Sequence, residues 1–372
     1  MSHTIYYIDR TVGEEISTRP LEGKEQLLFQ ELILAYQRGY CYLCGDIESL
    51  KQLSKQFKEY RLATEKYSEH GNAMALVDQV FVLTYDSKRS APLPAVLQIG
   101  GKCCYIDISV AASNDWLLGR PCCLLGENLD DCDFFMLIAK FTNKNAARVQ
   151  FDSQHGGGNP LAKVLNHSVE KQKLPTLAFV DSDKKYGATA TYPTPATGDT
   201  ALSAEKESMK LLSQSHPPPH SLCKLDVHEA ENLIPVQILE ELLSKLPNMK
   251  PGLERLKHLQ TIQNGEPALY YDYKNGFPYI KSAPARAYWH SILTQLGGTE
   301  QDMPPKEKPQ TKEHSCDELF FPPLSSNKLL ERAICSMEGK TQLEPDPHLV
   351  PYWENISTAI LTWGFASSPR YA

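Results

Sequence analysis

The sequence predicts an α/β protein: a central parallel sheet, flanked by an N-terminal α+β domain and a mainly helical C-terminal region. From Pro121 onward, apolar strand-like runs alternate with helical stretches, which is typical of a parallel sheet covered by helices. Helical stretches followed by strand-like runs precede this part, and helical periodicity returns after Asn232. Because 372 residues are too many for one ordinary core, we expect domains at residues 1–116, 117–235 and 236–372.

In the N-terminal domain, residues 23–39 (GKEQLLFQELILAYQRG) place apolar side chains on one helical face and end at Gly39, which suits a left-handed helix cap. A second helix is expected over residues 47–67. Strands follow in DQVFVLTYD and in AVLQIGGKCCYIDIS, where Gly100 and Gly101 suit a tight hairpin turn. This mixture predicts the α+β character.

The central domain contains four expected strands, with the sequences CCLLG, ARVQF, TLAFV and SLCKLDV. Helices are expected between them near CDFFMLIAKF, PLAKVLNHSV and SAEKESMKLLSQ. In such open parallel sheets, ligands bind at the carboxyl ends of the strands, so this edge is where functional residues are expected.

The C-terminal region is expected to form helices at PVQILEELLSKL, LERLKHLQTI and YWENISTAILTWGFA, with a mobile loop over residues 303–315. Between them lies an aromatic and basic stretch that either stacks on unpaired bases or packs a loop-rich core. Its members are Tyr270, Tyr271, Tyr273, Lys274, Phe277, Tyr279, Lys281, Arg286, Tyr288 and Trp289.

Composition limits the classes of partner. The net charge of −7 argues against a protein that coats nucleic acid through bulk electrostatics, so a polyanion must bind locally through a positive patch, a bound cation or a partner protein. No run approaches the roughly 20 apolar residues of a membrane span, and no secretory pattern opens the chain. The ten cysteines are therefore expected to be reduced thiols of a cytoplasmic protein. Cys41 and Cys44 form a CxxC without a second ligand pair, which favours buried thiols over structural zinc.

Acidic residues follow three of the four central strands. The groups are Glu127 with Asp130 and Asp131, then Asp181 with Asp183, and finally Glu229 with Glu231. Because side chains alternate along an extended strand, each of the last two pairs is expected to face one way. Two carboxylates about 4 Å apart repel by roughly 1 kcal/mol in water and roughly 4 kcal/mol at an effective dielectric of 20, so they need protons or cations. An all-oxygen set favours Mg2+ or Mn2+, with Ca2+ as an inert substitute.

The second strand ends instead in a run of glycines, Gly156, Gly157 and Gly158, followed by Asn159 and Pro160. Glycines allow close approach of a ligand, and asparagine before proline is a good helix start, so a phosphate could bind there. A flexible turn is the competing interpretation.

This order of features resembles the Toprim domain over residues 121–235: a strand-end glutamate, a glycine-rich turn, a DxD and a final acidic motif. The segment HEAEN is similar to the ExEN motif of OLD-like nucleases and of Toprim effectors in bacterial antiphage systems. One departure is that Gly126 precedes the first glutamate and Asn128 follows it, whereas the family has glycine directly after the glutamate.

The resemblance implies a Toprim endonuclease with two Mg2+ or Mn2+ ions, which would hold the attacking and leaving oxygens of a phosphodiester. The implied metal ligands are Glu127, Asp131, Asp181, Asp183, Glu229 and Glu231. The implied catalytic residues are Glu127, Asp181 and Asp183, with Lys184 or Lys185 stabilising charge on the phosphate. The implied substrate is DNA or RNA such as tRNA. The implied partner is an ATPase sensor that restrains a toxin-like effector. A homodimer is a further possible assembly.

Simpler interpretations compete. Aspartates are common where a strand becomes a loop, and glutamates are common at helix N-termini. A DxD also occurs in haloacid-dehalogenase phosphotransferases, but Lys185 stands where those enzymes need a hydroxyl or a small residue. The alternative function is a non-catalytic Toprim scaffold that assembles a defence complex.

Overall fold

The computed structural model describes residues 5–65, 79–85, 102–143, 148–149, 151–158, 160–188, 191–214, 217–244, 246, 249–307, 321–324 and 328–366. The chain forms two compact units. Unit 1 comprises Met1–Phe179, Ala204–Cys223 and Asn355–Ala372, and unit 2 comprises Val180–Ser203 and Lys224–Glu354. The α/β class is confirmed, because the chain contains two four-stranded, all-parallel sheets and many helices. The division into three domains stays a prediction.

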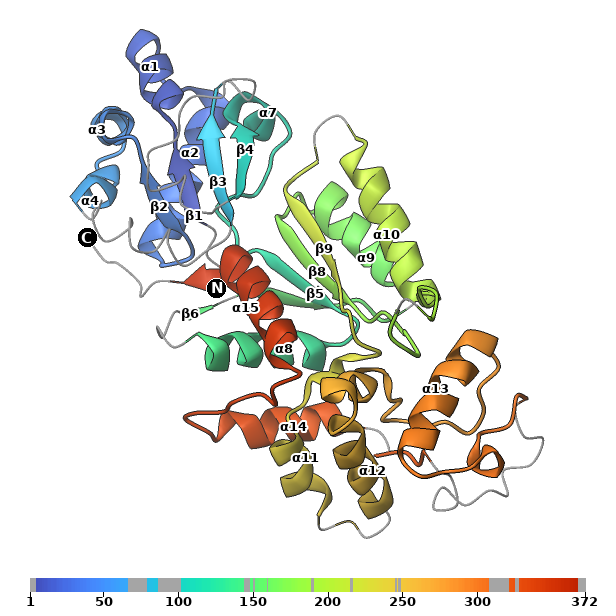
Figure 1. Cartoon of the computed structure of the whole chain (residues 1–372). Coiled ribbons are helices and arrows are strands. Elements are labelled where there is room, and N and C mark those ends of the chain that lie inside the picture. Colours follow the sequence, from blue (N-terminus) through green and yellow to red (C-terminus); the bar gives the residue numbers. More distant parts are fainter. Residues whose placement is uncertain are drawn as a thin grey trace. The chain divides into compact units, whose positions relative to one another are not determined.

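The first sheet of unit 1 has the strand order β2-β1-β3-β4. Its strands are β1 (Ile5–Ile8), β2 (Tyr42–Gly45), β3 (Gln79–Thr84) and β4 (Lys102–Asp107). Every residue of β1 is buried, and the strand pairs with β2 and β3 on its two sides. The helices beside this sheet, in blue to blue-green in Figure 1, are α1 (Arg10–Thr18), α2 (Gly23–Gln37), α3 (Ile47–Gln56), α4 (Tyr60–Glu65) and α7 (Ile108–Ser113).

The prediction that the N-terminal domain is α+β is wrong, because the described strands of this sheet all pair in parallel. Strands β3 and β4 pair in parallel, with Gln79 opposite Lys102, and the 17 residues from 85 to 101 are long enough for a parallel crossover. The predicted hairpin turn and the strand before it lie outside the described residues. The expected cap at Gly39 is confirmed by its φ of 76°, and the single helix predicted from residue 47 is two helices, α3 and α4.

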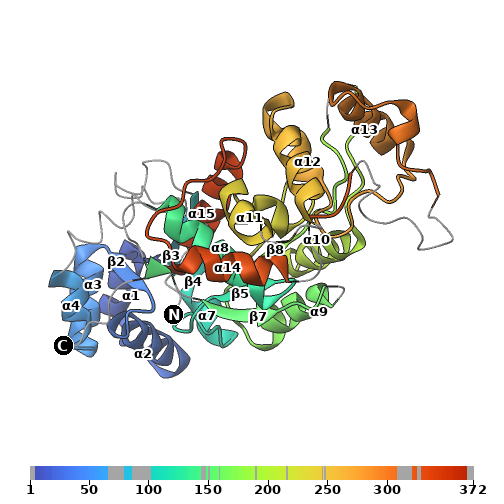
Figure 2. The same cartoon turned by 90° about the horizontal axis from the view of Figure 1, so that it is seen from below.

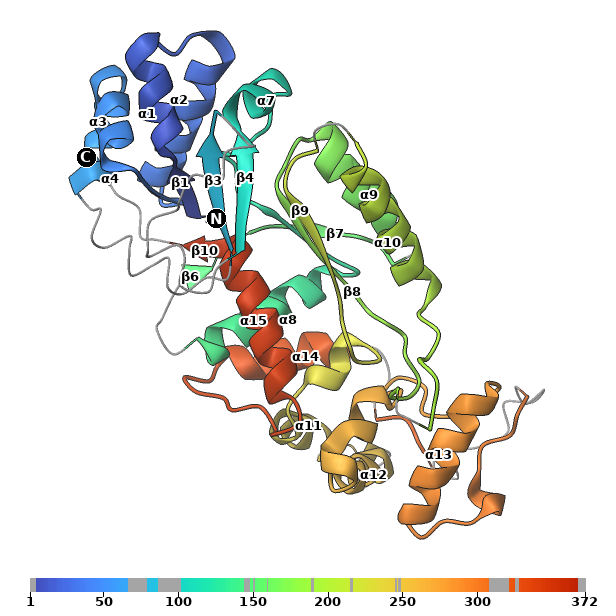
Figure 3. The same ribbon diagram turned by 45° about the horizontal axis from the view of Figure 1, so that its top comes forward.

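The second sheet of unit 1 has the order β7-β5-β8-β9. Its strands are β5 (Cys123–Gly126), β7 (Asp152–His155), β8 (Thr176–Val180) and β9 (His220–Lys224). Both β5 and β8 are buried throughout, as expected for central strands of a parallel sheet covered on two faces. Figure 3 shows α8 (Leu129–Thr142) on one side of this sheet, with α9 (Leu161–Asn166) and α10 (Asp199–Leu212) on the other.

The second strand of this sheet differs from its prediction. The apolar run ARVQF does not join the sheet: β6 (Arg148–Val149) pairs antiparallel with β10 (Phe365–Ala366). The sheet strand is β7, the polar segment that follows, which pairs in parallel with β5. Because β7 is an edge strand, its side chains are partly or fully exposed and carry little of the apolar pattern that marks a buried strand. The predicted strands at β5, β8 and β9 are confirmed.

Unit 2 is mainly helical. Its elements are η2 (Ala230–Leu233), α11 (Val236–Leu243), α12 (Lys250–Gln260), η4 (Gln263–Tyr270), α13 (Ala283–Gln295), η5 (Glu300–Asp302), α14 (Leu329–Glu338) and the first turn of α15 (Val350–Gly364). Helix α11 packs against both α12 and α14 (Figures 1 and 2). The predicted helices near α11, α12 and α15 are confirmed. Residues 308–320, within which most of the predicted mobile loop falls, lie outside the described residues.

The aromatic stretch of unit 2 is mostly core. Its buried members, each at most 6% exposed, are Tyr270, Tyr271, Tyr273, Phe277, Tyr288 and Trp289. Phe277 lies against Trp289 with ring centroids 4.5 Å apart, and both rings contact Phe321. The packing interpretation is therefore confirmed for these six residues. None of the helices in the described ranges has the length and apolar character that spanning a bilayer needs.

Candidate functional site

Unit 2 contains a cluster in which two of the predicted acidic residues share one cation. The ammonium nitrogen of Lys274 lies 2.8 Å from Oε2 of Glu229 and 3.0 Å from Oε1 of Glu231. Both glutamate side chains are only 9% exposed, while that of Lys274 is 47% exposed. Glu229 and Glu231 thus reach a common partner, but Glu231 lies in the first turn of a 3-10 helix and not on an extended strand, so the alternation argument does not apply and the helix N-terminus interpretation does.

Local backbone geometry positions this pair. Glu229 is extended, with φ −147° and ψ 168°, and it caps the short 3-10 helix η2, which contains Glu231. The amide Oδ1 of Asn232 accepts a hydrogen bond from the backbone N–H of Glu229 at 3.0 Å. Its Nδ2 donates to the carbonyls of Ala268 and Tyr271 at 2.9 and 2.8 Å. The motif therefore ties the acidic segment to the chain that leads to Lys274.

A second charged pair adjoins the cluster. Nε2 of His228 lies 3.8 Å from Oδ2 of Asp272, and the His228 ring is buried. Burial alone would lower the pKa of His228, but the interactions with Asp272 and with Glu229 outweigh it and raise that pKa above its usual 6.5. His228 is thus a buried residue with an ionic partner, and its Nδ1 has no hydrogen-bond partner among the described residues.

The three-residue cluster carries an excess negative charge, because two carboxylates share one ammonium. Burial, and then repulsion from Glu231, raise the pKa of Glu229 from its usual 4.5 to about 7, although Lys274 opposes the shift. Oε1 of Glu229 is buried and has no hydrogen-bond partner among the described residues. Carboxylate oxygens are also the ligands that a hard divalent ion takes, and the role of Glu229 and Glu231 as metal ligands stays a prediction.

The raised pKa of Glu229 predicts a pH dependence of stability. Between pH 4.5 and about 7 the folded protein binds more protons than the unfolded chain, so the free energy of unfolding falls as pH rises. This residue alone accounts for about 3 kcal/mol at most. We expect Glu229→Gln, measured by urea unfolding in EDTA, to remove this decline and to be more stable than wild type at pH 8. If the free energy of unfolding of Glu229→Gln falls with pH as steeply as that of wild type, the raised pKa of Glu229 is contradicted. The matched control is Glu254→Gln, which replaces an exposed acid.

The loop after β8 holds Asp181 and Asp183, but their alternation argument does not apply. Asp183 has a φ of 54°, in the left-handed region, so the backbone does not stay extended as the prediction required. The backbone N–H of Asp183 donates to the carbonyl of His228 at 3.0 Å, next to the acidic pair in sequence. Its side chain lies over Gly198, where an added Cβ would stand 1.9 Å from Oδ2 of Asp183. Glycine at position 198 therefore makes room for this carboxylate.

The two lysines after the DxD have different surroundings. The ammonium group of Lys184 pairs with the carboxylate of Asp226, so it already has an anionic partner. The backbone carbonyl of Lys185 accepts a hydrogen bond from Nε1 of Trp289 at 2.7 Å, while its side chain is exposed. Of the two predicted phosphate-stabilising lysines, Lys185 is the one available for an anion.

The remaining predicted site residues lie in unit 1. Asp131 is buried and accepts a hydrogen bond from the backbone N–H of Asn128 at 2.7 Å, closing the cap of α8. Asn128 has an ordinary φ of −129°, so the turn after Glu127 does not need the glycine that the family has there. Asp131 therefore has a structural role as part of the cap of α8, and its role as a metal ligand stays a prediction.

The glycine run adjoins Glu127. The backbone N–H of Gly157 donates to the Glu127 carbonyl at 2.9 Å, and an added Cβ at Gly158 would lie 3.7 Å from Oε2 of Glu127. Gly156 has no room for a side chain, because its Cβ would lie 2.6 Å from the Gly126 carbonyl oxygen. Close approach of the two turns explains Gly156, whereas φ angles of 73° and 63° explain Gly157 and Gly158. Phosphate binding by Gly156, Gly157 and Gly158 stays a prediction.

Within the described ranges, no three His, Cys, Asp or Glu side chains are placed together so as to hold a metal ion. The cysteine expectation is confirmed at the CxxC: Cys41 and Cys44 are buried, and burial raises the pKa of Cys44 to about 12. A buried thiol with a raised pKa is a poor nucleophile.

No family model, no curated protein and no solved structure matches this chain. The resemblance to Toprim nucleases therefore depends on the motifs in the sequence. The geometry of unit 2 provides an independent basis for a functional proposal.

Sequence reasoning missed the roles of Lys274 and Asn232. Lys274 stands 43 residues after Glu231, inside an aromatic stretch where its charge suggested contact with nucleic acid. Asn232 is the last residue of the HEAEN segment, so the motif was visible although its hydrogen-bonding role was not. The signal that could have identified Lys274 is electrostatic: two buried acids close together require a nearby cation.

Proposed function

We propose that this protein is a divalent-metal-dependent nuclease that hydrolyses phosphodiester bonds in DNA or RNA. The observation that carries the proposal is the convergence of the Glu229 and Glu231 carboxylates on one cation position in a buried site. An all-oxygen donor set of this kind suits Mg2+ or Mn2+. The order of motifs in the sequence supports the same chemistry.

The roles follow from the contacts in unit 2. Glu229 and Glu231 would hold an ion, and Asp181 and Asp183 would provide further carboxylates from the neighbouring loop. The bound ion would lower the pKa of a water molecule and offset charge on the phosphate. Lys185 would stabilise that charge as well, since its side chain is exposed and Lys184 is engaged by Asp226. The roles of Glu127 and Asp131 remain predictions from the motif order.

The biological setting is inferred from the resemblance alone. We place the nuclease as the effector of a prokaryotic antiphage or toxin-like system, restrained or delivered by a partner such as an ATPase sensor. Purification of the tagged protein from its native host should yield a stoichiometric companion. Recovery of this chain alone, before and after phage challenge, would count against such a partner.

The nuclease proposal is tested with purified protein, plasmid DNA and total tRNA in Mg2+ or Mn2+. We expect cleavage by wild type and a loss of about 10²- to 10⁴-fold in Asp181→Asn and Glu231→Gln, because each removes an acid that positions or deprotonates the attacking water. The control Glu254→Gln, an exposed acid of α12, should stay within twofold of wild type. No cleavage by wild type, or equal cleavage by Asp181→Asn, would end the proposal.

The second candidate is a non-catalytic scaffold subunit. It is favoured by one observation: Lys274 already neutralises part of the charge on Glu229 and Glu231, so the pair can persist without a metal. Calorimetry with Mn2+, run beside the cleavage assay, separates the two candidates. Absence of turnover, with or without metal binding, supports the scaffold, whereas turnover that depends on Asp181 excludes it.

A further inference from the structure

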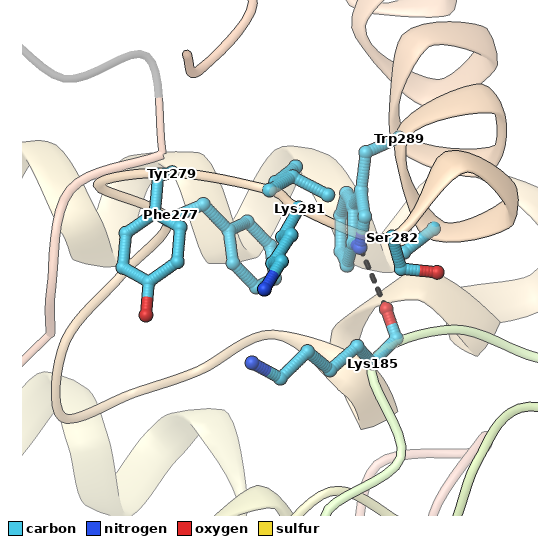
Figure 4. A pocket seen from close by; sticks show the side chains of 8 residues that line it. Lys185, Phe277, Tyr279, Lys281, Ser282 and Trp289 are labelled. Atoms are coloured by element: carbon cyan, nitrogen blue, oxygen red, sulfur yellow. Dashed lines mark hydrogen bonds between the residues drawn. The ribbon is translucent and has the colours of Figure 1, made fainter. Parts of the chain in front are cut away.

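Unit 2 contains a cavity of about 510 Å³ formed by the aromatic and basic stretch together with Lys185. Figure 4 shows the residues that shape it: Lys185, Phe277, Tyr279, Lys281, Ser282 and Trp289. They come from the loop after β8, from the segment before α13 and from α13 itself. A volume of this size falls within the range of small-molecule sites in proteins, about 300–1,000 Å³.

The cavity is positively charged. The side chains of Lys185 and Lys281 extend into it (Figure 4), and neither ammonium group forms an ion pair with any residue that the structure describes. Among the residues that the structure describes, no acidic side chain lines it. In a protein with a net charge of −7, a concave surface whose described lining carries two lysines favours an anion.

One side of the cavity is apolar and firmly held. Phe277 packs on Trp289 with ring centroids 4.5 Å apart, and Ile280 and Ala285 extend the same wall. Trp289 is fully buried, and its Nε1–H donates to the backbone carbonyl of Lys185 at 2.7 Å (Figure 4). This bond fixes the backbone of Lys185 beside the aromatic wall. The hydroxyl groups of Tyr279 and Ser282 add polar contacts at the rim.

We propose that this cavity binds one nucleotide, with the base against the half-buried ring of Tyr279 and the phosphate between Lys185 and Lys281. A nucleotide combines the two features that the cavity offers, a planar aromatic ring system and an adjacent anion. The nucleotide comes either as a free mononucleotide or as one unit of a single strand. If the nucleotide is one unit of a single strand, the cavity would bind the substrate of the proposed nuclease, and this inference then rests on that proposed function.

The test measures binding in EDTA, so that cleavage and metal binding do not contribute. Calorimetry with AMP, GMP, CMP and UMP reports the free nucleotide, and anisotropy of a fluorescein-labelled (dT)15 reports the strand. We expect one of these probes to bind wild type, and Lys281→Glu to weaken that binding about tenfold or more. The control is Lys250→Glu, a lysine of α12 that does not line the cavity; it should change binding by less than threefold.

A further probe separates a nucleotide site from a general anion site. If (dT)15 binds, an analogue with abasic positions should bind at least about fivefold more weakly than (dT)15. If a mononucleotide binds, ribose 5-phosphate should bind at least about fivefold more weakly than that mononucleotide. Equal affinity for the abasic probe, equal binding by Lys281→Glu and wild type, or no binding of any probe would overturn the proposal. These outcomes can be distinguished from failure of the nuclease proposal, because binding is measured in EDTA, where neither metal nor cleavage contributes.

Discussion

Replacing Asn232 by alanine is expected to lower the free energy of unfolding by about 3 kcal/mol or more. The Asn232 side chain is 1% exposed and makes three hydrogen bonds, one to the N–H of Glu229 and two to the carbonyls of Ala268 and Tyr271. Alanine would leave those three backbone groups without this partner, and each buried unsatisfied group costs about 1–3 kcal/mol. Urea unfolding followed by circular dichroism measures the loss.

The matched control for this variant is Asn275→Ala. Asn275 is exposed, and its side chain contacts only the carboxylate of Asp272, so the change should stay within about 0.5 kcal/mol. A loss below about 1 kcal/mol in Asn232→Ala would show that the three bonds are replaced by water or by local rearrangement. The expected result would make the asparagine of the HEAEN segment a structural residue that fixes the backbone of Glu229.

Replacing Lys274 by methionine is expected to have the second largest effect, and the effect should depend on divalent metal. Breaking a buried ion pair by removing one partner costs about 3–5 kcal/mol. Because the Lys274 side chain is about half exposed, we expect a smaller loss of about 2 kcal/mol in EDTA. Mg2+ or Mn2+ should restore much of that loss, since the Glu229 and Glu231 carboxylates then have an open cation position.

Thermal unfolding of Lys274→Met with EDTA, Mg2+ or Mn2+ measures this prediction directly. The control is Lys328→Met, which removes an exposed lysine paired with Glu331 and should change stability by less than about 1 kcal/mol, with no gain from metal. Equal stability of Lys274→Met and wild type in EDTA, without a gain from metal, would show that the two carboxylates do not depend on Lys274. A destabilised variant that divalent ions rescue would support a cation site at Glu229 and Glu231.

The central strands could be predicted from sequence because burial on two faces leaves a continuous apolar run. TLAFV and CLLG are such runs, and β8 and β5 form within those segments. The polar edge strand β7 could not be predicted in this way, because its contact with β5 is made by backbone groups while its polar side chains are partly or fully exposed. The neighbouring ARVQF run carried the stronger apolar signal and belongs to a different pairing.

The sequence by itself determined the α/β class, the two central buried strands β5 and β8, and the acidic residues that follow β5, β8 and β9. Only the tertiary structure decided which charges meet. Lys274 reaches Glu229 and Glu231 across more than forty residues, and Lys185 lines one cavity with Lys281 although 96 residues separate them. Apolar periodicity is a local consequence of burial, so it can be read from neighbouring residues. A salt bridge or a cavity depends instead on which distant segments of the chain meet, and the spacing of residues along the sequence does not show this.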